Sequence, residues 1–126
     1  MKLRIKGSSL RLRLTRSEVR QLVEEGTVEE KVPFAPQATL IYRLRQDPKL
    51  TSITAGYTGN IIEIRVPEAA AAQWCSTDQV GLEHSQAVPG GPLKIILEKD
   101  WACLAPRSDE DESDNFPHPN TDSAKC

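Results

Sequence analysis

The chain has 126 residues, of which 27% are charged, 38% are hydrophobic and 5% are aromatic. This length suits one globular domain with a modest aliphatic core and is too short for two independent cores. The net charge of −2 at pH 7 argues against indiscriminate binding to nucleic acids. No apolar run approaches the roughly 18 residues of a membrane helix, and no apolar stretch follows the charged N-terminus as in a signal peptide. We therefore expect a cytoplasmic protein.

Charge is distributed unevenly along the chain. Residues 1–20 carry seven basic side chains and one acidic side chain, whereas residues 98–126 carry eight acidic and three basic side chains. A chain of this kind can fold its acidic end over its own basic surface, or it can present each end to a different partner.

The first elements in chain order are predicted to be two short strands and a helix. Apolar and basic residues alternate over residues 2–6 and again over residues 10–14, with Gly7 in the turn between them. This alternation is typical of half-buried strands. Thr15 stands three residues before Glu18, a spacing that favours a capping box at the start of a helix. The helix is expected to end at Gly26. Two further strands are predicted over residues 28–32 and 40–45, joined by a loop that contains prolines.

The second half of the chain follows the same pattern. Apolar positions 10, 12 and 14 correspond to 62, 64 and 66, and a Gly-Asn turn begins at Gly59. A second helix is predicted to start at Pro67-Glu68, because proline suits the first helical turn. The agreement predicts an internal duplication, with one ββαββ unit over residues 1–47 and another over residues 53–100.

These elements predict an α+β fold that is mainly antiparallel β, with about eight short strands and two short helices. One ββαββ unit alone would leave an apolar face in water, so two units are expected to pack as a sandwich or to close into a small barrel. We expect one globular domain over residues 1–104 and an acidic, proline-rich tail over residues 105–126 that is disordered or loosely docked. An exposed strand edge would favour a homodimer over a monomer.

The candidate binding residues are the basic side chains that alternate with apolar ones along the predicted strands. Because neighbouring strands lie about 4.8 Å apart, such cations would repel one another unless an anion lies on them. The alternative is a solvated sheet face, whose basic side chains cover apolar surface and discourage strand association. No aromatic side chains lie between the bases, so we do not expect specific nucleic-acid binding. The predicted anion-binding residues, which we expect on one surface, are Arg4, Lys6, Arg11, Arg13, Arg43 and Arg45.

A second interpretation rests on cysteine and histidine residues near the C-terminus. Cys103, His118 and Cys126 could bind zinc or copper, although the sequence has no closely spaced ligand pair. Cys75 or His84 could supply a fourth ligand, but both also suit a core position. Apart from a possible zinc ion, no cofactor is expected.

Motifs of known enzymes are missing. The sequence has no Gly-x-Ser-x-Gly elbow, phosphate-binding loop or His-Glu-x-x-His helix. A closed eight-stranded barrel would be similar to the triphosphate tunnel metalloenzymes, which carry Glu-x-Glu-x-Lys on the first strand. Here that strand reads Lys2-Leu-Arg4-Ile-Lys6. A small phosphate-processing barrel enzyme is therefore a third interpretation. The first is a non-catalytic binding or accessory domain with an anionic ligand or an acidic protein partner.

Three segments of the sequence are distinctive. They are KLRIKGSSLRLRLTRSEV near the start, VPEAAAAQWCSTDQVGLE in the middle, and EKDWACLAPR followed by EDESDNFP near the end. Together they resemble a small family of uncharacterised bacterial proteins, a domain of unknown function, over essentially the whole chain. The resemblance implies a bacterial cytoplasmic protein and implies no particular activity.

Overall fold

The structure, a computed structural model, describes residues 1–101. Strand pairs and helices alternate along this part of the chain in the order ββαββ followed by ββαββ. The elements are β1 (Lys2–Ile5), β2 (Ser9–Leu14), α1 (Arg16–Glu25), β3 (Thr27–Ala35), β4 (Ala38–Asp47), β5 (Thr54–Thr58), β6 (Ile61–Pro67), α2 (Glu68–Ser76), β7 (Gly81–Val88) and β8 (Gly91–Lys99). The predicted eight strands and two helices are confirmed.

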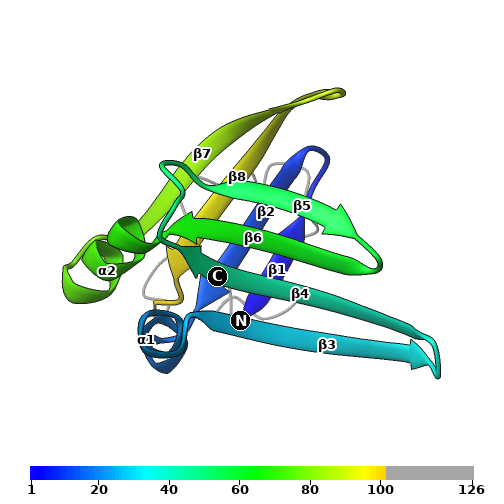
Figure 1. Cartoon of the computed structure of the whole chain (residues 1–126), viewed down its shortest axis with the longest axis horizontal. Helices are drawn as coiled ribbons and strands as arrows, with labels where there is room; N and C mark the ends of the chain where they lie inside the picture. Colours follow the sequence, from blue (N-terminus) through cyan, green and yellow to red (C-terminus); the bar gives the residue numbers. More distant parts are fainter. Residues whose placement is uncertain (102–126) are drawn as a thin grey trace, which may run out of the picture.

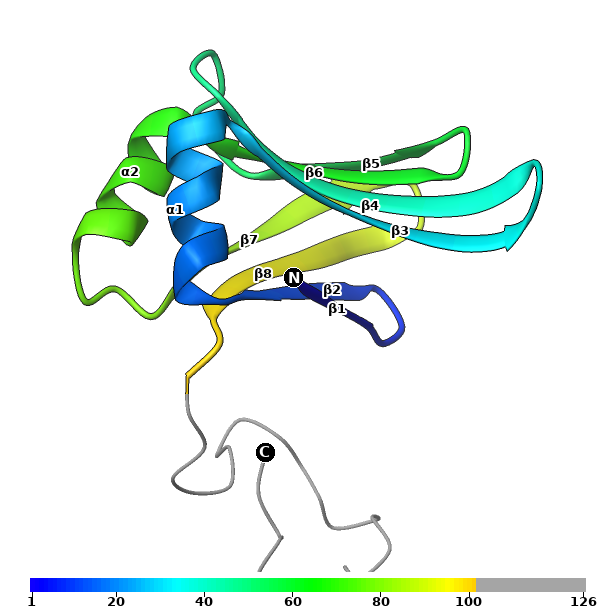
Figure 2. The same ribbon diagram turned by 90° about the horizontal axis from the view of Figure 1, so that it is seen from below.

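The strands form two four-stranded sheets that face each other. We call them sheet A, with the strand order β1-β2-β8-β7, and sheet B, with the order β3-β4-β6-β5. Figure 1 shows the two sheets stacked on one another. Figure 2 shows α1 and α2 side by side over one end of the sandwich and the four hairpin turns at the other end. Each helix links the sheets, because α1 leads from β2 to β3 and α2 leads from β6 to β7.

The strand directions are mainly antiparallel, as predicted, but each sheet is mixed. The four hairpins are antiparallel, whereas β2 pairs with β8 and β4 pairs with β6 in parallel. Since every hairpin turn lies at the same end of the molecule, the second strand of each hairpin runs from that end toward the helices. Two such strands side by side are necessarily parallel. Of the two predicted arrangements the sandwich is confirmed, and residues 1–101 form no closed barrel.

The ends of α1 follow the predicted signals. The Thr15 hydroxyl accepts a hydrogen bond from the Glu18 amide, and the Glu18 carboxylate accepts one from the Thr15 amide. Gly26 ends the helix in the left-handed conformation, with φ at 87°, which only glycine adopts without strain. Pro67 differs slightly from its predicted place, because it is the N-cap of α2 and lies just before the first helical turn.

The β3–β4 hairpin is longer than predicted. Strand β3 continues through Pro33 to Ala35, where a loop was expected, and the register shifts between these two residues. Proline has no amide hydrogen for a sheet ladder, but β3 is an edge strand of sheet B, where one side of the strand needs no partner.

The core lies between the sheets, at the end that the helices cover. Trp74 of α2 is fully buried, and its indole Nε1 donates a hydrogen bond to the Val80 carbonyl oxygen at 3.2 Å. Leu22 of α1 packs into the same cluster. The other fully buried large side chains come from both sheets and are Leu12, Leu14, Leu44, Ile64, Val66, Ile95 and Leu97.

The two halves of residues 1–101 share one order of elements. A shared order does not by itself establish a duplicated sequence, so the internal repeat over residues 1–47 and 53–100 stays a prediction. Neither helix in this part of the chain is long and apolar enough to cross a membrane.

Candidate anion-binding face

The outward-facing side of sheet A carries three of the six predicted basic residues, Arg4, Arg11 and Arg13. In β2 the side chains of Leu12 and Leu14 are buried, so the alternating Arg11 and Arg13 lie on the opposite, outer side. Cross-strand pairing places further bases beside them, from β1 and from β8. We call this surface the basic face, and it consists of Lys2, Arg4, Arg11, Arg13 and Lys94. Lys6 follows β1 in the adjoining turn.

Like charges lie directly opposite one another on the basic face. In the β1–β2 ladder, Arg4 is the cross-strand partner of Arg11, and Lys2 is the partner of Arg13. Directly opposed like charges destabilise a strand pair. The arrangement therefore favours the presence of negative charge on this surface.

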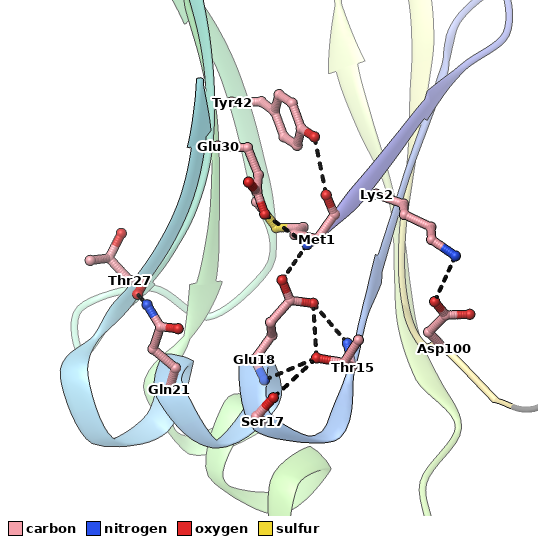
Figure 3. A network of polar contacts seen from close by, with 10 residues as sticks. All are labelled: Met1, Lys2, Thr15, Ser17, Glu18, Gln21, Thr27, Glu30, Tyr42 and Asp100. Atoms are coloured by element: carbon pink, nitrogen blue, oxygen red, sulfur yellow. Dashed lines mark hydrogen bonds and ion pairs between the residues drawn. The ribbon is translucent and has the colours of Figure 1, made fainter. Parts of the chain in front are cut away.

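Two carboxylates of the described chain lie close to these bases. The Glu98 Oε1 atom is 3.2 Å from Arg11 Nε and 3.5 Å from Arg13 Nε, so one carboxylate serves two guanidinium groups. The Asp100 Oδ2 atom is 3.0 Å from Lys2 Nζ (Figure 3). The side chains of Arg11 and Arg13 are 15% and 17% exposed. They therefore pack along the outer surface of the sheet and do not extend into the solvent.

Arg43 and Arg45 do not belong to the basic face. Both lie on the outer side of sheet B, which is the other outer surface of the sandwich. The expectation that all six predicted residues share one surface is therefore wrong. The physical reason is the connection through α1, which carries the chain from sheet A to sheet B before β4 begins.

The arginines of sheet B are paired with carboxylates in a compact network. Arg43 Nε is 2.7 Å from Glu29 Oε1, and Arg43 Nη1 is 2.9 Å from Glu63 Oε2. The other Glu63 oxygen is 2.6 Å from Arg65 Nε. Hydrogen bonds from Arg65 and Arg43 lower the pKa of Glu63 below its ordinary value, although burial opposes the shift. Positive charge on this face is thus largely balanced by its own acids.

Two further residues, Lys94 and Glu98, lie beside the predicted arginines, and they were not predicted from the sequence. Both lie on β8, whose parallel pairing with β2 sets Lys94 opposite Ser9 and Glu98 opposite Arg13. The alternation of Lys94, Ile96 and Glu98 was visible in the sequence, but nothing local indicated which strand β8 would join.

The predicted metal ligands Cys103, His118 and Cys126 lie outside the described residues. Within residues 1–101, no group of three or more His, Cys, Asp or Glu side chains is placed to hold a metal ion. Cys75 is a half-buried free thiol that packs against the core. His84 is half-buried on β7 opposite Ile95, on the inner side of sheet A.

A separate polar cluster attaches the start of β1 to the rest of the fold. The Met1 amino group forms ion pairs with Glu18 and Glu30, the latter at 2.8 Å. The Tyr42 hydroxyl donates a hydrogen bond of 3.1 Å to the Met1 carbonyl oxygen. Figure 3 shows these contacts between α1, sheet B and the beginning of β1. The cluster holds β1 in place, and with it the Arg4 side of the basic face.

Taken together, two stacked mixed sheets, a helix pair over one end and a basic outer surface define a small α+β sandwich domain. The chain belongs to the Family of unknown function (DUF7009), whose model matches residues 1–120. The predicted membership of a family of unknown function is thereby confirmed. No curated protein and no solved structure matches the chain.

Proposed function

We propose that the protein is a non-catalytic binding domain whose basic face binds an acidic ligand or an acidic segment of a protein partner. The observation that carries the proposal is the placement of Arg4 directly opposite Arg11. Two guanidinium groups one strand apart repel each other in water, and each can donate paired hydrogen bonds to a carboxylate or a phosphate. An anion on this surface would add charge-assisted hydrogen bonds from the guanidinium groups to those that Glu98 already accepts.

The chemistry of the face favours carboxylates or phosphates over nucleobases. Among the residues of sheet A that point outward over residues 1–101, none is aromatic. Single-stranded nucleic acids depend on aromatic side chains for stacking. The ligand is therefore expected to be recognised by its charge, and binding is expected to weaken as salt screens that charge.

The acidic residues 109–114 are proposed to compete with the ligand for the basic face. The chain leaves sheet A at Asp100, whose amide donates a hydrogen bond of 2.8 Å to the Leu14 carbonyl oxygen of β2. Asp100 therefore lies beside the end of β2, and five of the six residues from Asp109 to Asp114 are acidic. Removal of residues 102–126 is expected to strengthen the binding of an added acidic peptide.

A decaglutamate peptide with a fluorescent label provides the test, with fluorescence anisotropy at low salt as the measurement. The double variant Arg4→Gln/Arg11→Gln is expected to bind about tenfold more weakly than the parent chain. The matched control is Arg43→Gln/Arg45→Gln, which removes the same charge from sheet B and is expected to change affinity by less than about twofold.

Equal losses in both double variants would show that only net charge matters and would overturn the proposal. No binding by the parent chain, with or without residues 102–126, would overturn it as well. Two other expectations stay predictions, namely a cytoplasmic location and a monomeric or dimeric state. Zinc binding by Cys103, His118 and Cys126 also stays a prediction, and elemental analysis of the purified protein tests it.

A further inference from the structure

The end of the sandwich opposite the helices leaves inward-facing apolar side chains uncovered. Figure 2 shows the hairpin turns at this end. Near the helices the inner side chains are buried, as at Leu12 and Leu97, but Ile5 is 57% exposed and Tyr57 is 69% exposed. A sandwich normally buries the inner side chains of both sheets against each other. Apolar side chains gathered in water at one end therefore indicate a binding surface.

A cavity lies between the sheets at this end. Its volume is about 400 Å³, within the range of roughly 300–1,000 Å³ that is typical of small-molecule sites. Strands of both sheets line it, and the Tyr57 hydroxyl is the only polar side-chain group among its lining residues. The larger lining side chains are Leu10, Leu40, Tyr57, Ile62, Val88 and Leu93.

A smaller hollow of about 200 Å³ adjoins the cavity and shares Leu40 and Tyr57 with it. This hollow reaches Phe34, which is 73% exposed on the β3–β4 hairpin. The apolar space is therefore longer than the main cavity alone, a shape that suits an extended ligand.

The lining chemistry distinguishes between an alkyl chain and a peptide. A peptide would bring backbone amide and carbonyl groups into the cavity, and each would lose its hydrogen bonds to water without finding a side-chain partner other than Tyr57. An unbranched alkyl chain has no such groups, and its burial is favourable over its whole area. The cavity therefore favours an aliphatic ligand.

The turns at the mouth of the cavity indicate the charge of the ligand's polar end. The four turns comprise residues 6–8, 36–37, 59–60 and 89–90, and Lys6 is the only charged residue among them. Lys6 lies in the turn that leads into β2, whose Leu10 lines the cavity. We propose that this end of the sandwich binds a fatty acid, with its acyl chain in the cavity and its carboxylate beside Lys6.

Isothermal titration calorimetry tests the site. Laurate, kept below its critical micelle concentration, is titrated into the full chain and the heat of binding is measured. The variant Val88→Phe places a larger side chain in the cavity and is expected to weaken laurate binding at least about tenfold. The control is Val80→Phe, since Val80 is a valine that is 55% exposed between α2 and β7 at the helix end and does not line the cavity. This control is expected to bind laurate as the parent chain does.

A second variant tests the polar end without altering the cavity. Lys6→Gln is expected to weaken laurate binding by about threefold to tenfold and to leave the binding of uncharged dodecanol unchanged. Arg4→Gln/Arg11→Gln is expected to leave laurate binding unchanged. The fatty-acid site and the proposed anion binding by the basic face are therefore tested independently of each other. Three results would overturn the proposal: no laurate binding by the parent chain, equal binding by Val88→Phe and Val80→Phe, or binding only to phosphatidylcholine–phosphatidylglycerol vesicles.

Discussion

Replacement of Glu18 by glutamine is expected to weaken the attachment of β1 while leaving the start of α1 intact. The two oxygens of Glu18 have different partners. Its Oε1 accepts hydrogen bonds from the Thr15 amide at 2.9 Å and the Thr15 hydroxyl at 3.1 Å, whereas its Oε2 pairs with the Met1 amino group. Glutamine keeps an oxygen for the capping box, in which either residue is effective, but turns an amide NH₂ toward the ammonium group.

The expected loss follows from these contacts. A hydrogen bond to a charged group contributes about 1.5–3 kcal/mol. Glu30 still holds the Met1 amino group at 2.8 Å, and the Glu18 side chain is 20% exposed, so about 1–2 kcal/mol is expected for Glu18→Gln. Glu18→Ala also removes the capping contact and is expected to cost about 1 kcal/mol more.

The pH dependence separates the ion pair from ordinary packing. Burial lowers the pKa of the Met1 amino group, but hydrogen bonds from it to Glu18 and Glu30 outweigh this effect, so the pKa lies above its ordinary value of 8.0. Burial raises the pKa of Glu18, but the hydrogen bond from the amino group outweighs it, so that pKa lies below 4.5. The amino group's contribution is full below pH 8.0 and is lost as pH rises through its raised pKa. The Glu18 contribution is full above pH 4.5 and is lost as pH falls through its lowered pKa.

Urea unfolding followed by far-UV circular dichroism measures the difference, with a cleavable tag at the C-terminus so that Met1 keeps its free amino group. The free-energy gap between the parent chain and Glu18→Gln is expected to be greatest between about pH 5 and pH 8 and to shrink as the pH rises through the raised pKa of the amino group. Glu24→Gln, on the exposed side of α1, serves as the control and is expected to change stability by less than about 0.5 kcal/mol. A gap that stays constant from pH 7 to pH 10 would refute the ion-pair account.

Two further predictions concern packing. Gly81→Ala is expected to destabilise the fold by about 1–3 kcal/mol or more, because a Cβ atom there would overlap the Leu97 carbonyl oxygen. Gly90→Ala, with no atom within 4 Å of the added carbon, is the control and is expected to be neutral in urea unfolding. Trp74→Ala is expected to cost about 3–5 kcal/mol because it leaves a core cavity. Trp74→Phe is expected to cost less, because the Val80 carbonyl that loses the indole donor still accepts the Lys99 amide at 3.0 Å. Thermal unfolding that ranks these two variants in the opposite order would contradict the assignment of Trp74 to the centre of the core.

The features that could be predicted from the sequence are those with local signals. The start of α1 at Thr15 and its end at Gly26 depend on side chains within a few residues of each terminus. The strands of the hairpins are visible as alternation of apolar and polar residues. Pro33 was misread because proline interrupts a strand in most places, and its tolerance here depends on β3 being at the edge of sheet B.

The site was harder to predict because its assembly depends on contacts distant in the sequence. The alternation in β2 correctly indicated an outer row with Arg11 and Arg13. It did not indicate that β4 joins the other sheet, so Arg43 was assigned to the wrong surface. The parallel pairing of β2 with β8, which places Lys94 and Glu98 beside the arginines, has no local signature. The cavity at the turn end was missed because it is formed by apolar residues from six strands.

The most direct test of the basic face is an NMR titration of the ¹⁵N-labelled chain with decaglutamate. Backbone amide shifts are expected to change along β1, β2 and β8 of sheet A, most strongly around Arg4 and Arg11, while those of β4 and β6 stay unchanged. Shift changes spread equally over both sheets, or centred on Arg43 and Arg65 of sheet B, would contradict this prediction.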